Sequence, residues 1–248
     1  MKRTITYSQY SHTGSRPVNE DAAACFVREE TWLFVLCDGL GGHGMGDAAS
    51  QLAVSAFGEA WQHYEKGNPR TFWEESFRLA QKKLLEAQKE KRASGRMKTT
   101  AAALLTDGKK AWVAHMGDSR CYAFSKGKVL RRTSDHSVPQ MLALSGQIRE
   151  AEIRNHPDRS LLLKALGVAG EEVVPELSKP FSLRKCDAFL LCSDGFWELI
   201  TEAGMEQYLA EAKSAEDWLT RMAAHVRTAG RDRDMDNNSA IALWCRKE

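Results

Sequence analysis

The apolar residues of this 248-residue chain follow two different spacings, which separate strand-rich parts from a helical part. Residues 22–37 carry Val, Phe, Trp and Cys in short apolar runs on either side of a polar turn at 28–30, which predicts two paired strands. Residues 99–132 return to short apolar runs, separated by Asp107-Gly108 and Lys126-Gly127, two dipeptides that favour hairpin turns. We therefore expect a meander of antiparallel strands there.

Between these parts the apolar residues take the 3.6-residue repeat of a helix. Apolar positions recur at helical spacing from 49 to 64, with Asp47 as a candidate N-cap and Gly67 as a stop. Asn68-Pro69 is a typical helix start, and the pattern that follows to Arg92 has one apolar side and a Lys/Glu-rich end. These residues predict an antiparallel pair of helices.

The second half of the chain continues this mixture. Residues 137–160 keep no single period and are interpreted as an excursion from the sheet, which often carries function. Strands are predicted at 187–192 and 239–244, with helices beginning near Thr201 and near Ser214, whose Asp217 lies at capping-box spacing. Helices grouped between runs of strands are typical of α+β proteins, and no repeat or linker divides the chain, so we expect one domain.

Composition excludes several classes of protein. With 43% hydrophobic and 27% charged residues the chain is an ordinary globular one, and its net charge of +2 argues against nucleic acid as the main partner. Its first residues lack the apolar core of a signal peptide, and no apolar run approaches the roughly 20 residues of a membrane helix. We expect a soluble, cytoplasmic protein that does not bind membranes. The six cysteines form no C-x-x-C pair, which favours buried thiols over zinc or disulfides.

The candidate chemistry lies in acidic residues at the ends of the apolar runs. A buried strand that ends in an unpaired Asp carries a desolvation cost of several kcal/mol unless a positive group offsets it. The acidic positions at or beside predicted strand ends are Glu20, Asp21, Asp38, Asp118, Asp194 and Asp236. If the fold gathers these carboxylates, two divalent ions would hold them and activate a bridging water, and Gly39 would add a carbonyl oxygen. Oxygen ligands alone indicate Mg²⁺ or Mn²⁺, although a single Asp-Gly pair is more often a plain turn.

These residues fall in motifs that resemble a known family over nearly the whole chain. The motifs, in family order, are Arg16-Pro17-Val18-Asn19-Glu20-Asp21, Asp38-Gly39-Leu40-Gly41-Gly42-His43, Lys98-Thr99-Thr100, Gly117-Asp118-Ser119-Arg120, Thr133-Ser134-Asp135-His136-Ser137, His156-Pro157-Asp158-Arg159-Ser160, Ser193-Asp194-Gly195 and Asp236-Asn237-Asn238-Ser239. Each is weak alone, but eight in order are specific. The chain resembles the metal-dependent type 2C (PPM family) serine/threonine protein phosphatases in their bacterial form. The resemblance implies an α-β-β-α sandwich of two antiparallel sheets flanked by helix pairs. It also implies a single catalytic domain over residues 1–248, with a flap segment at about 137–165.

The resemblance also implies the ligands of two core ions, Mn²⁺ or Mg²⁺. Asp38, Asp194 and Asp236 match the carboxylates of the first metal. Glu20, Asp38 and the carbonyl of Gly39 match the ligands of the second. A water that bridges the two ions would attack phosphorus directly and in line, without a phosphoenzyme.

Three residues are expected to be catalytic on the same grounds, namely Arg16, Asp21 and Asp38. Arg16 matches the guanidinium that binds the substrate phosphate, a task suited to a planar, always-charged donor, whereas its plainer interpretation is a surface arginine beside a proline. Asp21 would support the metal ligands through bound water. Leu40 stands where many eukaryotic relatives carry a histidine that is proposed to protonate the departing alkoxide, so His43 and metal-bound water remain equal candidates for the proton donor.

A third, weaker metal of the bacterial members would be held by Asp118 and Asp194, with Ser160 of the flap contributing through water. The structural alternative for Asp118 is an ion pair with Arg120. A structural interpretation also exists for Asp135 and His136, in which they only fix a turn.

The expected activity is hydrolysis of phosphoserine and phosphothreonine on proteins, by a monomer that opposes a bacterial serine/threonine kinase. The expected partners are phosphorylated proteins, including that cognate kinase. One alternative is a pseudophosphatase, which would bind phosphoproteins without turnover and would be favoured by loss of metal carboxylates; none is lost here. A second alternative is another two-metal phosphohydrolase, such as a nuclease or nucleotidase, against which the balanced charge and the motif order argue.

Overall fold

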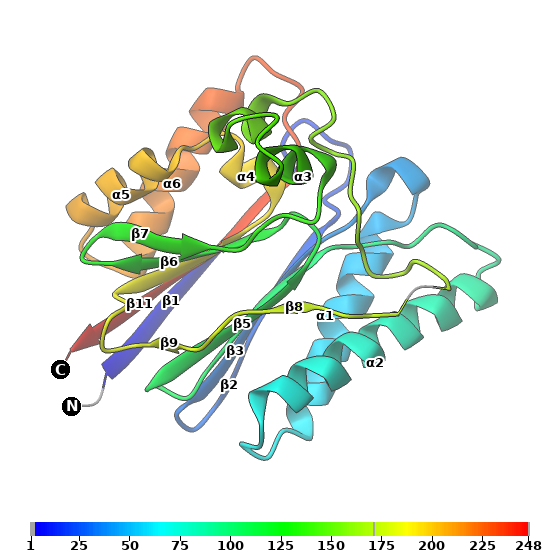
Figure 1. Ribbon diagram of the computed structural model, residues 1–248, viewed down its shortest axis with the longest axis horizontal. Helices are drawn as coiled ribbons and strands as arrows, with labels where there is room; N and C mark the ends of the chain where they lie inside the picture. Colours follow the sequence, from blue (N-terminus) through cyan, green and yellow to red (C-terminus); the bar gives the residue numbers. More distant parts are fainter. Residues whose placement is uncertain (1–2, 171, 248) are drawn as a thin grey trace.

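Two antiparallel sheets packed face to face form the centre of the computed structural model, which describes residues 3–170 and 172–247 (Figure 1). The first sheet has the order β1-β11-β10-β6-β7. Its strands are β1 (Arg3–His12), β11 (Asn238–Lys247), β10 (Ala188–Cys192), β6 (Arg120–Ser125) and β7 (Lys128–Arg132). The second sheet has the order β2-β3-β4-β5-β8, and β9 also pairs with β5. Its strands are β2 (Asp21–Arg28), β3 (Thr31–Asp38), β4 (Ala101–Thr106), β5 (Lys110–Met116), β8 (Glu176–Leu177) and β9 (Phe181–Ser182).

A pair of helices covers the outer face of each sheet (Figure 1). The helices α1 (Gly46–Gln62) and α2 (Pro69–Glu90) lie on the second sheet, and α5 (Glu202–Glu211) and α6 (Ala215–Gly230) lie on the first. Shorter helical turns complete the structure: η1 (Gly41–His43), α3 (Val138–Leu144), η2 (Glu150–Asn155) and α4 (Asp194–Trp197). No helix in the described ranges combines the length and apolar character needed to span a bilayer.

Three apolar layers hold these elements together, as burial of apolar surface requires for a four-layer protein. Phe57 and Phe77 lie in the layer between the second sheet and its helices, with ring centroids 5.0 Å apart. Phe189 belongs to the layer between the two sheets. Phe124 and Trp218 lie in the layer between the first sheet and its helices, 5.1 Å apart. The predicted α-β-β-α sandwich is confirmed.

Several predicted boundaries are confirmed by their contacts. Asn68 caps α2 by accepting a hydrogen bond from the backbone N–H of Arg70, and Pro69 is the first helical residue. Thr201 and Ser214 cap α5 and α6 in the same way. The hairpin turn at 126–127 has φ of 53° and 73° at its two residues.

Three details of the prediction are wrong. The strand β1 was not expected, because its alternating Thr, Tyr and Ser residues have little apolar content; it is an edge strand that pairs only with β11. The helix α1 begins at Gly46 and ends at Gln62, so Asp47 lies in its first turn and does not cap it. Met45 is the N-cap residue, in the left-handed conformation. The short helix α4 directly after β10 was also missed.

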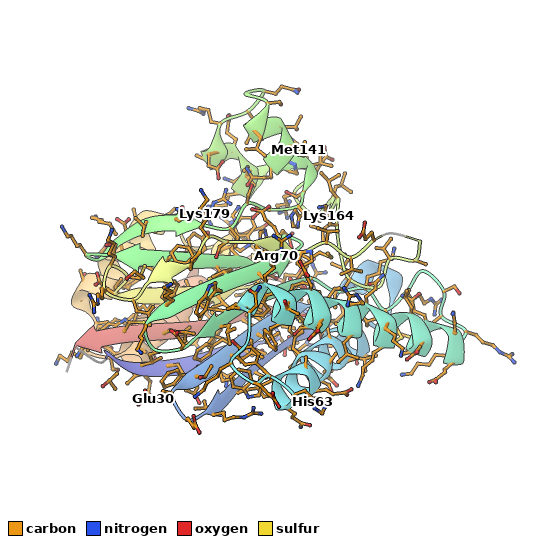
Figure 2. All side chains as sticks on the ribbon, turned by 60° about the horizontal axis from the view of Figure 1, so that its bottom comes forward. Glu30, His63, Arg70, Met141, Lys164 and Lys179 are labelled. Carbon is orange, nitrogen blue, oxygen red and sulfur yellow. The ribbon has the colours of Figure 1, made fainter. Side chains whose placement is uncertain are left out.

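The excursion predicted after the strand meander contains α3 and η2 and projects beyond the sheets (Figure 2, where Met141 is labelled). We call residues 137–165 the flap segment. Two ion pairs fix it to the helices after β10: Arg154 contacts Glu202 at the start of α5 at 3.0 Å, and Arg159 contacts Glu198 at the end of α4 at 3.1 Å. Several of its apolar side chains are exposed, including Leu144.

Candidate metal centre

Strand pairing brings the predicted acidic residues to one end of the sandwich. In the antiparallel pair β2–β3, Asp21 lies directly opposite Asp38. In the other sheet, Cys192 at the end of β10 lies opposite Ala240 of β11 and Arg120 of β6. Asp194 comes two residues after Cys192, Asp236 four residues before Ala240, and Asp118 two residues before Arg120. All three therefore lie at that same end. We call Glu20, Asp21, Asp38, Asp194 and Asp236 the carboxylate centre.

Hydroxyl groups of the neighbouring strand hold the backbone of Asp38. Its N–H donates to Thr100 Oγ1 at 3.1 Å, and Thr99 Oγ1 donates to its carbonyl at 2.8 Å. The charges of Asp194, Asp118 and Asp236 act on its carboxyl group as well. Burial, together with the charges of Asp21 and Asp194, raises the pKa of Asp38 well above its usual range.

The pKa values of Asp194 and Asp21, the neighbours of Asp38, are also raised. Burial and the charge of Asp236 raise the pKa of Asp194 to about 6, although Gly195 N–H donates to its carboxylate at 2.6 Å. Burial raises the pKa of Asp21 to about 7. Ser193 Oγ donates to Asp21 Oδ2 at 2.9 Å, but Asp21 Oδ1 is buried without a hydrogen-bond partner in the described structure. These carboxylates lack enough donors to balance their charge.

Close backbone packing sets the position of Glu20. Its Oε1 accepts a hydrogen bond from Gly46 N–H at 3.2 Å, and its carbonyl accepts one from Gly39 N–H at 3.0 Å. A side chain at Gly39 would collide with the carbonyl of Gly46, and one at Gly41 would collide with the Glu20 carboxylate. Burial raises the pKa of Glu20 as well. Gly39 and Gly41 are therefore required for the close approach.

Arg16 reaches the centre from the loop before β2. Its Nε and Nη2 each donate to the Asp236 carboxylate at 3.2 Å, and Nη1 lies 3.5 Å from Asp234. The side chain is 43% exposed, so its donors can be reached from solvent. The structure therefore places Arg16 at the centre, in a bidentate pair with a predicted metal ligand.

Asn237 is a positioning residue that the sequence interpretation missed. Its Oδ1 accepts from Glu20 N–H at 2.7 Å, while its Nδ2 donates to the carbonyls of Thr13 and Val18 at 2.7 and 3.0 Å. It thereby fixes the loop that carries Arg16 and Glu20 to the loop that carries Asp236. Its place inside the Asp-Asn-Asn-Ser motif was the available signal.

Asp118 is buried beside the carboxylate centre, and burial with the charges of Asp194 and Asp135 raises its pKa well above normal. It has no ion pair with Arg120, so that alternative is wrong. Arg120 instead binds Asp135 through two hydrogen bonds of 2.8 and 2.6 Å. Trp197 Nε1 donates to the Asp118 carbonyl at 3.0 Å.

Around Arg120 lies a second group of buried charges, which we call the Arg120 cluster: Arg120, Tyr122, Asp135, Trp197 and Glu202. The guanidinium lies 3.4 Å from the centroid of the Trp197 ring. Tyr122 Oη accepts from Arg120 at 3.0 Å and donates to Glu202 at 3.1 Å. Every charge in this cluster has an opposite charge or a donor beside it.

Three further residues from the sequence motifs are Ser160, Leu40 and His43. Ser160 is exposed in the flap segment and makes no side-chain hydrogen bond to any residue that the structure describes. Leu40 follows Gly39, and its N–H donates to the carbonyl of Lys98 at 2.9 Å. The side chain of His43 lies outside the described part of the chain.

The donor set of the carboxylate centre fits a hard divalent cation. It offers oxygen atoms only, from several carboxylates whose pKa values are raised by burial and by the charges of the neighbouring carboxylates. Asp21 Oδ1 in addition lacks any donor within the described residues. A divalent cation would relieve both the desolvation and the mutual repulsion of these groups.

Comparison with known proteins agrees with this geometry. The family model described as protein phosphatase 2C matches residues 8–238. The chain belongs to the protein phosphatase 2C family. It is 32% identical over 205 residues to the serine/threonine phosphatase stp of Listeria innocua, which covers 80% of each chain.

Solved structures of this family have the same fold. The serine/threonine phosphatase Stp1 from Staphylococcus aureus superimposes with a TM-score of 0.88 at 26% identity, over 99% of this chain and 96% of the other. The catalytic domain of the phosphatase PstP, solved with two manganese ions, gives a TM-score of 0.83 at 26% identity, over 98% and 99%. The predictions of family, fold and enzyme class, a serine/threonine phosphoprotein phosphatase of the 2C type, are confirmed.

This phosphatase also has a group of side chains of the kind that bind transition metals, outside the carboxylate centre. The ligand atoms of His115, His136 and Glu176 all lie within 4.8 Å of one another, whereas the predicted carboxylates are not gathered so closely among the described residues. His115 Nε2 lies 2.7 Å from the carbonyl of Ser134 and so carries a proton. His136 Nδ1 accepts from Gly117 N–H at 3.1 Å, so the neutral ring has its proton on Nε2, facing Glu176.

The hydrogen bonds of this group argue against a metal there, because ligation at His136 Nε2 would need an imidazolate anion. Burial and the neighbouring His115 lower the pKa of His136 to about 4, which keeps the ring neutral. The two parallel rings, 4.8 Å apart, fix the turn before Asp118. The structural interpretation of Asp135 and His136 is therefore confirmed.

The six cysteines form no disulfide in the described structure, and all but Cys25 are buried. Burial raises the pKa of Cys25 to about 12, which makes a thiolate unfavourable. This agrees with the expectation of buried thiols.

Proposed function

We propose that the phosphatase hydrolyses phosphoserine and phosphothreonine on proteins, using divalent cations held by the carboxylate centre. Asp38, Asp194 and Asp236 would hold the first cation. Glu20, Asp38 and the Gly39 carbonyl would hold the second. The observation that supports this assignment most is the set of buried carboxylates with raised pKa values and too few donors. When bound, the cations would neutralise charge on the phosphoryl oxygens and lower the pKa of a water molecule.

The chain's own residues would prepare the reaction. Asp21, held by Ser193 at 2.9 Å and left with one free carboxylate oxygen, would accept a proton from water at that oxygen. Asp38, whose pKa is raised by burial, would ionise when a cation binds, since a bound cation favours the ionised carboxylate.

Arg16 would bind the substrate phosphate. Its three donors converge on Asp236 and Asp234, and a cation on Asp236 would compete for that carboxylate and free the guanidinium for an incoming phosphate. Binding of substrate would therefore be coupled to binding of metal.

Asp118 with Asp194 would hold a third, weaker cation, as its burial and raised pKa support. Ser160 would join this site only through water, because its side chain is exposed in the flap segment. The proton for the departing alkoxide would come from His43 or from water held at the centre, since Leu40 has no group that can donate.

The substrates would be phosphoproteins, including a cognate bacterial serine/threonine kinase, and not nucleic acid, given the net charge of +2. We propose that the protein acts as a monomer in the cytoplasm. Mn²⁺ is a cation that a relative with the same fold binds at two positions.

Hydrolysis of a phosphothreonine peptide tests the proposal directly. Protein stripped of metal and titrated with Mn²⁺ should gain activity with metal, and both Asp38→Ala and Asp194→Ala should abolish that gain. A wild-type protein that binds Mn²⁺ but stays inert toward several phosphopeptides would instead favour the pseudophosphatase. Preference for a nucleotide or a nucleic acid over phosphopeptides would favour another phosphohydrolase.

A further inference from the structure

A pocket lies on the side of the sandwich, where the two sheets separate. The edge strand β7 belongs to one sheet, and the short strands β8 and β9 end the other. Residues 178–180 connect β8 to β9: Ser178 N–H still donates to the carbonyl of Val113 in β5 at 2.8 Å, whereas residues 179–180 have no ladder partner in β5. The resulting cavity has a volume of about 340 Å³, within the range of small-molecule sites.

The floor of this pocket is apolar, because the core between the two sheets continues into it. Val113, Cys121 and Phe181 belong to that core and line the cavity together with Leu177. An apolar ligand group would therefore contact side chains that are already desolvated.

Two cations at the pocket have no carboxylate partner among the described residues. Arg131 lies over the Phe181 ring, 5.3 Å from its centroid, and makes no side-chain hydrogen bond or ion pair in the described structure. Lys179 lines the same cavity and is exposed (labelled in Figure 2). By contrast, Arg132 is already bound to Gln140, Asp135 and Glu150. The one carboxylate that lines the pocket, Glu176, lies 3.5 Å from His136.

Besides these two cations, the pocket has two hydroxyl groups that can donate hydrogen bonds. Ser178 Oγ accepts from Val113 N–H at 3.0 Å, and Thr133 Oγ1 accepts from Cys121 N–H at 3.0 Å. Neither hydroxyl donates to an acceptor in the described ranges, so each O–H can point to a ligand.

We propose that this pocket binds a small organic anion, such as an aryl carboxylate or sulfonate. The apolar part of the anion would rest on Val113 and Phe181, and its charged group would meet Arg131 and Lys179. Arginine is well suited to this task because its planar group binds an anion through two parallel hydrogen bonds. The site is separate from the carboxylate centre and does not depend on the proposed catalytic residues.

Phenylacetate and benzenesulfonate are suitable probes, with phenylacetamide as the neutral control of the same shape. We expect saturable binding of both anions to the Mn²⁺-loaded protein by calorimetry, at least tenfold tighter than binding of the amide. Amide chemical shifts should change around residues 113–115, 131–133 and 177–181, and not around 38, 194 and 236.

The double variant Arg131→Ala/Lys179→Ala should weaken anion binding at least tenfold at unchanged melting temperature, because both side chains are exposed. The matched control Lys110→Ala/Lys185→Ala removes the same charge outside the pocket and should bind like the wild type. Equal binding of phenylacetamide, unchanged binding by the double variant, equal loss in the control, or shift changes confined to the carboxylate centre would each overturn the proposal.

Discussion

Two groups of charged side chains lie side by side at one end of this phosphatase, and their charges are arranged in opposite ways. In the Arg120 cluster the charges are balanced: Arg120 and Asp135 form a bidentate pair, with side chains only 3% and 1% exposed. In the carboxylate centre acidic groups face one another, and burial raises the pKa of Asp194 to about 6 and that of Asp21 to about 7.

The difference separates a structural site from a binding site. A buried pair whose donors and acceptors are all used has nothing left for a ligand, and its loss would be felt as instability. A group of like charges is unfavourable in the folded protein until a ligand of opposite charge arrives, so its loss would be felt as lost function. Substitutions in the Arg120 cluster should therefore lower stability, whereas substitutions in the carboxylate centre should lower activity.

Replacement of Asp38 should give the largest functional effect. Asp38→Asn keeps the size of the side chain but removes a charge that both predicted metals share. We expect phosphopeptide hydrolysis at saturating Mn²⁺ to fall by about 10³-fold or more. The melting temperature of the metal-free variant at pH 7.5 should match or exceed that of the wild type. A clear loss of metal-free stability would mean that the carboxylate centre is structural after all.

Replacement of Arg120 should give the opposite result. Arg120→Met removes the bidentate partner of buried Asp135 and leaves it only the longer contact to Arg132 at 3.6 Å, which should destabilise the protein by about 3–5 kcal/mol in urea unfolding. The double variant Arg120→Met/Asp135→Leu removes both charges and should recover most of that loss. If the single variant is as stable as the wild type, the cluster does not hold the turn before Asp118.

The same contrast explains what sequence could predict. Apolar periodicity was enough for both helix pairs and most strands, because those elements bury continuous apolar faces. Apolar periodicity failed for β1, an edge strand with mostly polar side chains. It also failed for the start of α1, where Met45 adopts a left-handed conformation that no local signal indicates.

Site residues divide in the same way. The carboxylates could be proposed from sequence because an acidic residue at the end of an apolar run is costly in itself. The partner of Arg120 could not, because Asp135 lies 15 residues away and is brought close only by the turn between β7 and α3. Asn237 was missed for a related reason: its bonds to Thr13, Val18 and Glu20 join opposite ends of the chain.

The stability of the metal-free protein should depend on pH in a direction set by the carboxylate centre. The folded-state pKa values of Asp21 and Asp194, about 7 and about 6, lie above the usual value of 3.8. The folded state therefore binds more protons than the unfolded state between about pH 4 and 7, and stability must fall as pH rises through this window. We expect a loss of about 1–3 kcal/mol between pH 5 and pH 7.5.

Mn²⁺ should remove this loss, because the cation replaces the protons that the folded carboxylates otherwise retain. Urea unfolding at a series of pH values, with chelator and with Mn²⁺, measures both effects. Metal-free stability that rises from pH 5 to pH 7.5 would contradict the assignment of raised pKa values to this centre.

The smallest expected effect comes from the hydroxyl group that completes the Arg120 cluster. Tyr122→Phe removes an acceptor for Arg120 and a donor to Glu202 but keeps the ring and the Arg120–Asp135 pair. The lost hydrogen bonds should cost about 1–2 kcal/mol of stability, measured by urea unfolding. Mn²⁺-dependent activity should stay within about twofold of the wild type, since no metal ligand is touched. A large loss of activity at nearly unchanged stability would show that the two groups do not act independently, and that the Arg120 cluster affects the activity of the carboxylate centre.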